Sequence, residues 1–175
     1  MLEVIVEKDL SGAGSRGNIR KVDYYGAWRA LEDLYEEGKI RAIGIYNFYS
    51  DRMVDIASFA RIRPMVNQVE THPYNQKIQA KEYMDKYGVQ IEAWAPFGEG
   101  RGGLFEDAIL KEIGAKYGKT TAQVMLRWHI QRGVVVIPKS THYERMVENI
   151  DVFDFTLRLM TFGGEPLLYP EVVCQ

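Results

Sequence analysis

Strand-like apolar segments alternate with helix-like amphipathic segments along this chain, and this alternation restricts its fold more than any other feature. Three short apolar runs start at Arg41, Met65 and Val89, about 24 residues apart, a spacing that suits one strand and one crossover helix. A fourth run, at residues 134–137, follows two helical patterns. Alternating strands and helices form parallel sheets with right-handed crossovers. The sequence therefore predicts an α/β protein with a parallel sheet.

The predicted helices are recognisable by their apolar faces and by the residues at their ends. A first helix is expected at residues 24–37, directly before Gly38. Ser50 and Asp51 are suited to cap the next helix, because their side-chain oxygens accept hydrogen bonds from free N–H groups. Thr120 is expected to cap the helix before the fourth strand in the same way.

The length of the chain limits how much of a barrel it can form. A complete (β/α)8 barrel typically needs about 250 residues, and this chain has 175. Four strand–helix units therefore predict either a small open sheet or half of a barrel. We divide the chain into an unassigned segment 1–22 with a short strand and a Gly/Ser-rich loop, an α/β region 23–157 and an irregular tail 158–175.

Composition and charge argue against several classes of function. The formal net charge is −2 and no basic stripe is present, so we expect no binding to nucleic acid. No apolar run approaches the length of a membrane span, and the first residues lack the basic region of a signal peptide. Cys174 is the only cysteine, and His72, His129 and His142 lack the spacing of metal ligands. We expect a cytoplasmic protein without a metal site.

A basic loop follows the fourth strand and leads into another helix. Lys139 and Ser140 lie in this loop, and Arg145, Glu148 and Asn149 follow in the predicted helix. Helix N-termini and nearby cations favour phosphate groups, so this segment indicates an anion-binding site. The alternative is an ordinary strand–helix turn with two solvated cations.

Several segments, in this order and spacing, resemble the aldo-keto reductase family. They are residues 25–45, 67–73, 93–96, 121–128, 137–140, 148–149 and 152–155. The resemblance covers about residues 24–157. It implies a (β/α)8 barrel that uses NADPH to reduce aldehydes and ketones. This chain looks like strands five to eight of that barrel, with their helices.

The resemblance also implies roles for three residues near the predicted strand ends. Asn47 and Gln68 are similar to the pair that hydrogen-bonds the nicotinamide carboxamide, and Trp94 is similar to the aromatic residue on which the nicotinamide ring stacks. Without the resemblance, we would interpret Trp94 as a core residue, because tryptophan is largely buried on average. Tyr46 departs from the family, which usually has a small hydroxyl residue directly before the asparagine.

The remaining implied roles concern the adenosine end of the cofactor. Lys139, Ser140 and Arg145 resemble the residues that bind the 2′-phosphate of NADPH. Glu148 and Asn149 resemble the contacts to the adenine edge. Two cations directed at one phosphate would favour NADPH over NADH.

The chain lacks the residues that the family uses for proton transfer. In the family, a tyrosine donates the proton beside a lysine, an aspartate and a histidine, and all four belong to the N-terminal half of the barrel. Asn18 falls where the histidine is expected. We therefore predict no catalytic residue in this chain, and expect that alone it is inactive. The available phenols, Tyr24, Tyr25, Tyr49 and Tyr74, are not accompanied by a lysine and an aspartate at the appropriate strand ends.

Three hypotheses about function remain open. The first is a fragment of an aldo-keto reductase that retains the cofactor-binding half and would act on a small carbonyl substrate once completed. The second is a non-catalytic nucleotide-binding or interaction module that self-associates through open sheet edges. The third is a decayed product that does not fold stably alone. The strands near Arg41 and Ile137 are the expected edges, unless residues 2–6 cover one of them.

Overall fold

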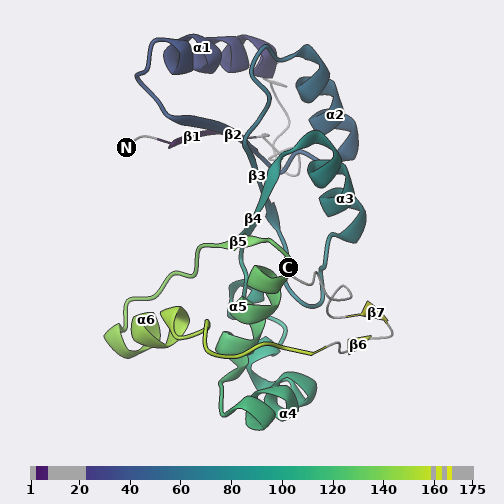
Figure 1. Ribbon diagram of the computed structural model, residues 1–175, viewed down its shortest axis with the longest axis vertical. Helices are drawn as coiled ribbons and strands as arrows, with labels where there is room; N and C mark the ends of the chain where they lie inside the picture. The colour runs from purple at the N-terminus through teal and green to yellow at the C-terminus, as the bar shows by residue number, and fades with distance from the viewer. Residues whose placement is uncertain (1–2, 8–22, 159–160, 163–164, 167–175) are drawn as a thin grey trace, which may run out of the picture. The chain divides into compact units, whose positions relative to one another are not determined.

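The computed structural model describes residues 3–7, 23–158, 161–162 and 165–166. Its described residues form two compact units (Figure 1). Unit 1 comprises those of Met1–Val69 together with Ile78–Ile91. Unit 2 comprises Glu70–Lys77 together with those of Glu92–Gln175. The predicted α/β region 23–157 contributes to both units.

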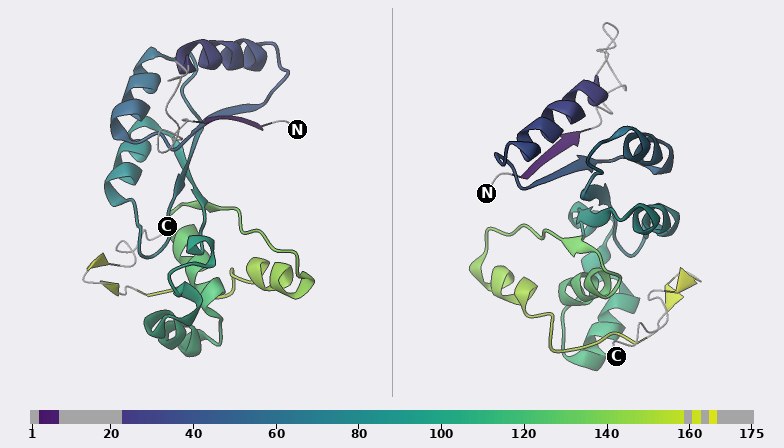
Figure 2. Two further views of the ribbon diagram at one scale, coloured as in Figure 1. Left: turned by 180° about the vertical axis from the view of Figure 1, so that it is seen from behind. Right: turned by 45° about the horizontal axis from the view of Figure 1, so that its top comes forward.

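Unit 1 contains parallel strands connected by helices, as the sequence predicts. The strands are β1 (Glu3–Glu7), β2 (Ala42–Tyr46), β3 (Val66–Glu70) and the start of β4 (Gln90–Trp94). The helices are α1 (Tyr24–Glu36), α2 (Ser50–Phe59) and α3 (Ile78–Tyr87). Strand β2 pairs in parallel with β1 on one side and with β3 on the other. Helices α2 and α3 lie side by side (Figure 2).

The core of unit 1 contains residues of strand β2 and of the helices. Ile43 and Ile45 of β2 are buried, as is Trp28 of α1, whose indole N–H donates to the Ile62 carbonyl oxygen at 3.2 Å. A Cβ added to Gly44 of β2 would stand 2.3 Å from a methyl carbon of Val66 in β3 and 2.8 Å from its carbonyl oxygen. Close backbone approach therefore requires glycine at this point of the sheet.

Unit 2 is mostly helical in its described part. After the end of β4 come the 3₁₀ turns η1 (Gly98–Gly100) and η2 (Leu104–Glu106), helices α4 (Ala108–Tyr117) and α5 (Thr121–Gln131), strand β5 (Val135–Val136) and helix α6 (Tyr143–Ile150). Strand β5 pairs in parallel with β4. Leu110, Val124, Leu126 and Trp128 of α4 and α5 form much of the core.

The ends of the elements confirm some predictions and correct others. Thr120 caps α5 as predicted, and Gln123 completes a reciprocal capping box. Ser50 does not cap α2, because the helix begins at Ser50 itself and the N-cap is Tyr49, which forms no side-chain cap bond. Strand β1 pairs along β2, so the first of the two expected edges is covered.

The tail contains a short antiparallel pair. Strands β6 (Thr161–Phe162) and β7 (Glu165–Pro166) pair with each other within the segment 158–175, which the sequence predicts to be irregular. The Gly/Ser-rich loop of segment 1–22, Asn18 and Cys174 lie outside the described residues.

Candidate functional site

A cavity of about 500 Å³ lies in unit 2, a size suited to a small ligand. It is bounded by the segment between β5 and α6, by α6 itself and by the N-terminus of α5. Its lining residues are Phe97, Phe105, Thr120, Thr121, Ala122, Lys139, Ser140, Thr141, His142, Arg145, Glu148 and Asn149. Five of the eight predicted cofactor residues therefore lie around one cavity.

The loop that leaves β5 is held by a local turn. The Ser140 hydroxyl oxygen accepts a hydrogen bond from the His142 N–H at 3.1 Å and lies 3.3 Å from the His142 carbonyl oxygen, to which it donates. His142 is the N-cap of α6 and forms no side-chain cap bond. The positive end of the α6 dipole and its first N–H groups therefore lie directly after the basic loop.

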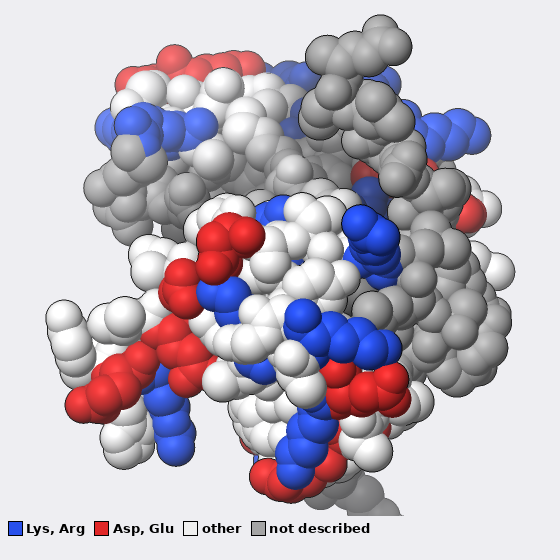
Figure 3. Space-filling view, turned by 60° about the horizontal axis from the view of Figure 1, so that its bottom comes forward, with Lys and Arg blue, Asp and Glu red and all other residues white. Residues whose placement is uncertain are grey.

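Two cations stand at this helix N-terminus. Lys139 and Arg145 are both exposed, and neither forms an ion pair with any other residue in the described part of the chain. Among the described residues drawn in Figure 3, basic and acidic side chains are interspersed. A small phosphate group fits this arrangement better than a polyanion does.

The cavity is also lined by residues that were not predicted to belong to the site. Thr121 and Ala122 belong to the first turn of α5, and the rings of Phe97 and Phe105 contact each other with centroids 5.4 Å apart. Thr120 was predicted only as a helix cap, yet it also lines the cavity. No periodic pattern marks the two phenylalanines, because they lie in irregular turns.

The residues predicted to bind nicotinamide follow the ends of strands. Asn47 directly follows β2, is buried, and has a backbone φ of 56°. Its backbone N–H donates to the Gln68 carbonyl oxygen at 2.9 Å, so unit 1 brings these two residues together. Tyr46 lies opposite Gln68 in the sheet. Trp94 is the last residue of β4, is half-buried, and belongs to unit 2 with the cavity.

Carboxylates accept hydrogen bonds from three of the phenols, Tyr24, Tyr25 and Tyr74. Tyr24 and Tyr25 both donate to Oδ2 of Asp55, and Arg52 donates to the Tyr24 hydroxyl, so these phenols do have a carboxylate neighbour. The hydrogen bond to Asp55 raises the pKa of Tyr25 above its ordinary value. The hydrogen bond from Tyr74 to Asp107 likewise raises the pKa of that phenol to about 12. A general acid needs the opposite shift.

The described residues contain no cluster of side chains suited to hold a metal ion, and no described helix is both long and apolar enough to span a membrane. His129 is fully buried in unit 2. Its Nδ1 lies 2.7 Å from the Met125 carbonyl oxygen and its Nε2 lies 2.9 Å from that of Thr71. His72 lies beside Glu70, with 3.5 Å between Nε2 and Oε1. The ring nitrogens of His129 and Nε2 of His72 therefore lie next to oxygen atoms of the chain itself.

Burial makes His129 a source of pH-dependent stability. Desolvation lowers its pKa from 6.5 to about 4, against the opposing effect of the two carbonyl contacts. Below about pH 6.5 the unfolded chain binds a proton that the folded chain excludes until about pH 4, so stability falls as the pH falls through this range. We expect urea denaturation to show a loss of about 2 kcal/mol between pH 7 and pH 5 from this group.

Replacing His129 with Gln should remove most of the loss in the free energy of unfolding between pH 7 and pH 5. His142→Gln, at an exposed position, is the matched control and should retain it. Burial also lowers the pKa of His72, which leaves a smaller dependence of the same sign in the His129 variant. Equal pH dependence in the wild-type chain and in His129→Gln would contradict the assignment.

Comparisons with known proteins identify the family of the chain. Residues 17–163 match the sequence profile of the Aldo/keto reductase family. A glyoxal reductase of Bacillus subtilis (strain 168) is 47% identical over 137 residues, which are 78% of this chain and 49% of that protein. The crystal structure of MGS-M4, an aldo-keto reductase from a Medee basin deep-sea metagenome library, is 44% identical with a TM-score of 0.75, and covers 77% of this chain and 50% of its own.

A further solved structure was determined with a cofactor. It is a Gox0644 mutant in complex with NADPH, 40% identical with a TM-score of 0.71, and the match covers 75% of this chain and 48% of that one. The chain thus spans about half the length of the relatives that it matches. Because the matched profile covers most of the sequence, the family is established. The chain belongs to the aldo/keto reductase family.

Proposed function

We propose that this chain binds NADPH through the cavity of unit 2, as the cofactor-binding part of an aldo-keto reductase that reduces a small carbonyl compound. The observation that carries the proposal is that Lys139, Ser140, Arg145, Glu148 and Asn149 surround one cavity. Within the family barrel, the chain corresponds to strands five to eight. A cytoplasmic location, for which the single cysteine is the only support, is part of the same proposal.

The lining residues suit the adenosine end of NADPH. Lys139, Arg145 and the N-terminus of α6 supply positive charge for the 2′-phosphate, and Ser140 supplies a hydroxyl. Glu148 and Asn149 supply an acceptor and an amide for the adenine edge. The absence of an ion pair between either cation and a described carboxylate leaves both charges available to a ligand.

The family resemblance assigns nicotinamide contacts to Asn47 and Gln68 in unit 1 and to Trp94 in unit 2, and each unit supports its own contacts. The backbone contact between Asn47 and Gln68 keeps two carboxamide side chains at neighbouring strand ends, where they can exchange hydrogen bonds with another carboxamide. Trp94 offers a ring for stacking. When bound, the cofactor supplies a hydride to a carbonyl carbon, and the Bacillus subtilis relative reduces glyoxal according to its name.

We further propose that the proton for the reduced oxygen does not come from the described residues. The phenols Tyr25 and Tyr74 have raised pKa values because each donates to a carboxylate, which makes them weaker acids. General acid catalysis typically contributes a factor of about 10²–10⁴ in rate. The isolated chain should therefore bind NADPH and reduce carbonyl compounds at most very slowly.

Two measurements on the isolated chain test this proposal. Titration of NADPH followed by its fluorescence should detect saturable binding, and an assay with nitrobenzaldehyde should detect no carbonyl-dependent oxidation of NADPH above background. Turnover at a rate ordinary for reductases, weakened by Lys139→Met, would contradict the proposed lack of a proton donor. A complete lack of NADPH binding would contradict the proposed cavity function.

A second candidate function is assembly with another copy of this chain, favoured by the exposed surface of α6. Tyr143, Met146, Val147 and Ile150 form one apolar stripe along this helix, and each is at least 48% exposed. Among the described strands, β5 pairs only with β4. Exposed apolar stripes and unpaired strand edges both favour association.

A further inference from the structure

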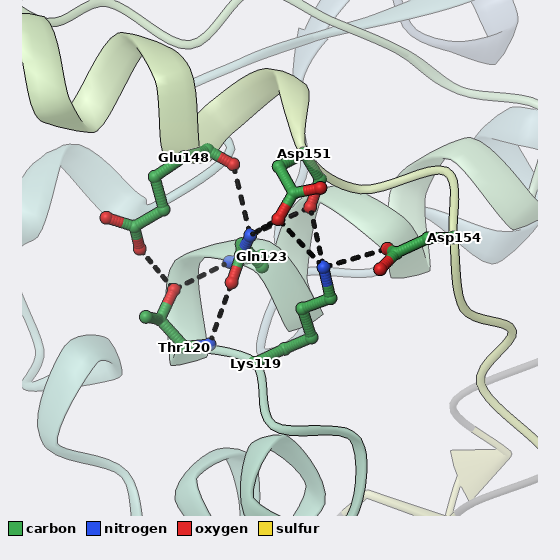
Figure 4. A network of polar contacts seen from close by, with 6 residues as sticks. All are labelled: Lys119, Thr120, Gln123, Glu148, Asp151 and Asp154. Carbon is green, nitrogen blue, oxygen red and sulfur yellow. Dashed lines mark hydrogen bonds and ion pairs between the residues drawn. The ribbon is translucent and has the colours of Figure 1, made fainter.

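A polar network joins the N-terminus of α5 to α6 (Figure 4). The Lys119 ammonium group lies 2.9 Å from Oδ2 of Asp151 and 2.8 Å from Oδ1 of Asp154. The Gln123 amide nitrogen donates to the carbonyl oxygens of Asp151 at 2.8 Å and Glu148 at 3.3 Å. These contacts fix the C-terminal half of α6 against α5.

Thr120 adds a contact that differs from the others, because it holds a side chain of the cavity wall. Its hydroxyl oxygen accepts from the Gln123 N–H at 3.3 Å, and its hydroxyl proton is donated to Oε1 of Glu148. A hydroxyl has a single proton, so this donation fixes the direction in which the hydroxyl points. Both Thr120 and Glu148 line the cavity.

The position of Glu148 matters because of its neighbour on the helix. Glu148 follows Arg145 by three residues, and side chains at this spacing lie next to each other on one face. A carboxylate on that face has an evident partner in the Arg145 guanidinium. The structure nevertheless contains no ion pair between these two described residues, and the Glu148 carboxylate is instead bound to Thr120.

We propose that Thr120 is a positioning residue that determines the preference for the 2′-phosphate. By holding the Glu148 carboxylate, it keeps this group from pairing with Arg145, and so preserves a free cation for the phosphate. The inference rests on the proposed NADPH function of the cavity and deepens it. Its readout is the ratio of the NADH and NADPH dissociation constants, because adenine contacts are common to both cofactors and cancel in that ratio.

A double-mutant cycle with Thr120→Val and Glu148→Gln tests the inference. Thr120→Val removes the hydroxyl with little change in volume, and should lower the ratio about tenfold, as the loss of one charge-assisted contact does. In the Glu148→Gln background, where the side chain has no charge to neutralise Arg145, Thr120→Val should leave the ratio unchanged. Thr120→Ser retains the hydroxyl and should keep the wild-type ratio.

Thermal melting separates this role from helix capping. Thr120→Val should lower Tm in both backgrounds, because the cap is lost in both. A fall in Tm with an unchanged ratio would mean that Thr120 is only a cap, and would overturn the inference while the proposed function stands. If the wild-type chain binds no NADPH, both fail together.

A second variant covers the possibility that Thr120→Val does not fold. Thr120→Gly is well tolerated at a helix N-cap and adds no charge to the cavity, but it has no hydroxyl to donate to Glu148. This variant should lower the ratio of the NADH and NADPH dissociation constants as Thr120→Val does. Combining it with Glu148→Gln should restore the wild-type ratio. A loss that persists in the Glu148→Gln background overturns the inference.

Discussion

Replacing Lys139 with Met and Arg145 with Ala together should lower the affinity for NADPH about 100-fold and remove the preference over NADH. Each cation is expected to form one charge-assisted contact to the 2′-phosphate. Because both side chains are exposed and screened, we take the lower end of the usual range, about 1.5 kcal/mol or roughly tenfold each. The NADH affinity should change little, since NADH has no 2′-phosphate.

The matched control is Lys116→Met, which removes one exposed cation from α4 in the same unit but outside the cavity. It should leave both dissociation constants unchanged. Fluorescence titrations of each variant at two salt concentrations provide the measurement, and the NADPH preference of the wild-type chain should weaken at the higher concentration. Equal loss of affinity for NADH and NADPH in the double variant would contradict the phosphate assignment.

The clustering of five predicted cofactor residues around one cavity could be predicted because these residues are close together in the sequence. Lys139 and Asn149 are ten residues apart, and a strand that leads through a short loop into a helix brings the loop and one face of the helix to one place. The Thr120 cap was predictable for the same reason. Its capping box with Gln123 involves residues three positions apart, and the side-chain types alone indicate it.

Long-range contacts could not be predicted in this way. Lys119 contacts Asp151 across 32 residues, and no periodic pattern connects the two positions. The contact between Thr120 and Glu148 spans 28 residues and depends on how α6 packs on α5. The contact between Tyr25 and Asp55 of α2 is a third case, with 30 residues between the two positions. Which side chains meet in such pairs depends on how the helices and strands pack against each other.

Two predictions about where elements begin and end were wrong: the Ser50 cap of α2 and the length of strand β5. Ser50 has a suitable capping side chain, but α2 begins one residue earlier than a Ser50 cap requires. Strand β5 is limited to Val135–Val136, although the apolar run is longer, because a strand extends only as far as its neighbour pairs with it. Apolar character alone therefore overestimated this strand.

The two faces of α6 have different chemistry. At 100° per residue, Arg145, Glu148 and Asn149 lie on the face that lines the cavity, and the stripe of Tyr143, Met146, Val147 and Ile150 lies on the opposite face. Tyr143 and Ile150 are each 73% exposed. A soluble protein seldom leaves such a stripe in contact with water unless it is an interaction site.

We therefore expect the wild-type chain to self-associate at micromolar concentration, and the double variant Met146→Lys, Ile150→Glu to be largely monomeric in light scattering. Full burial of one large aliphatic side chain contributes about 1.5–3 kcal/mol, so two charges in the stripe should weaken association by at least about 100-fold.

Ile109→Glu on α4 places a charge at a site that is 44% exposed outside the stripe, and should leave association unchanged. Since the stripe faces away from the cavity, the double variant should still bind NADPH. A strictly monomeric wild-type chain would mean that the α6 stripe does not bind a second copy, and equal dissociation in the Ile109 variant would move the interface elsewhere.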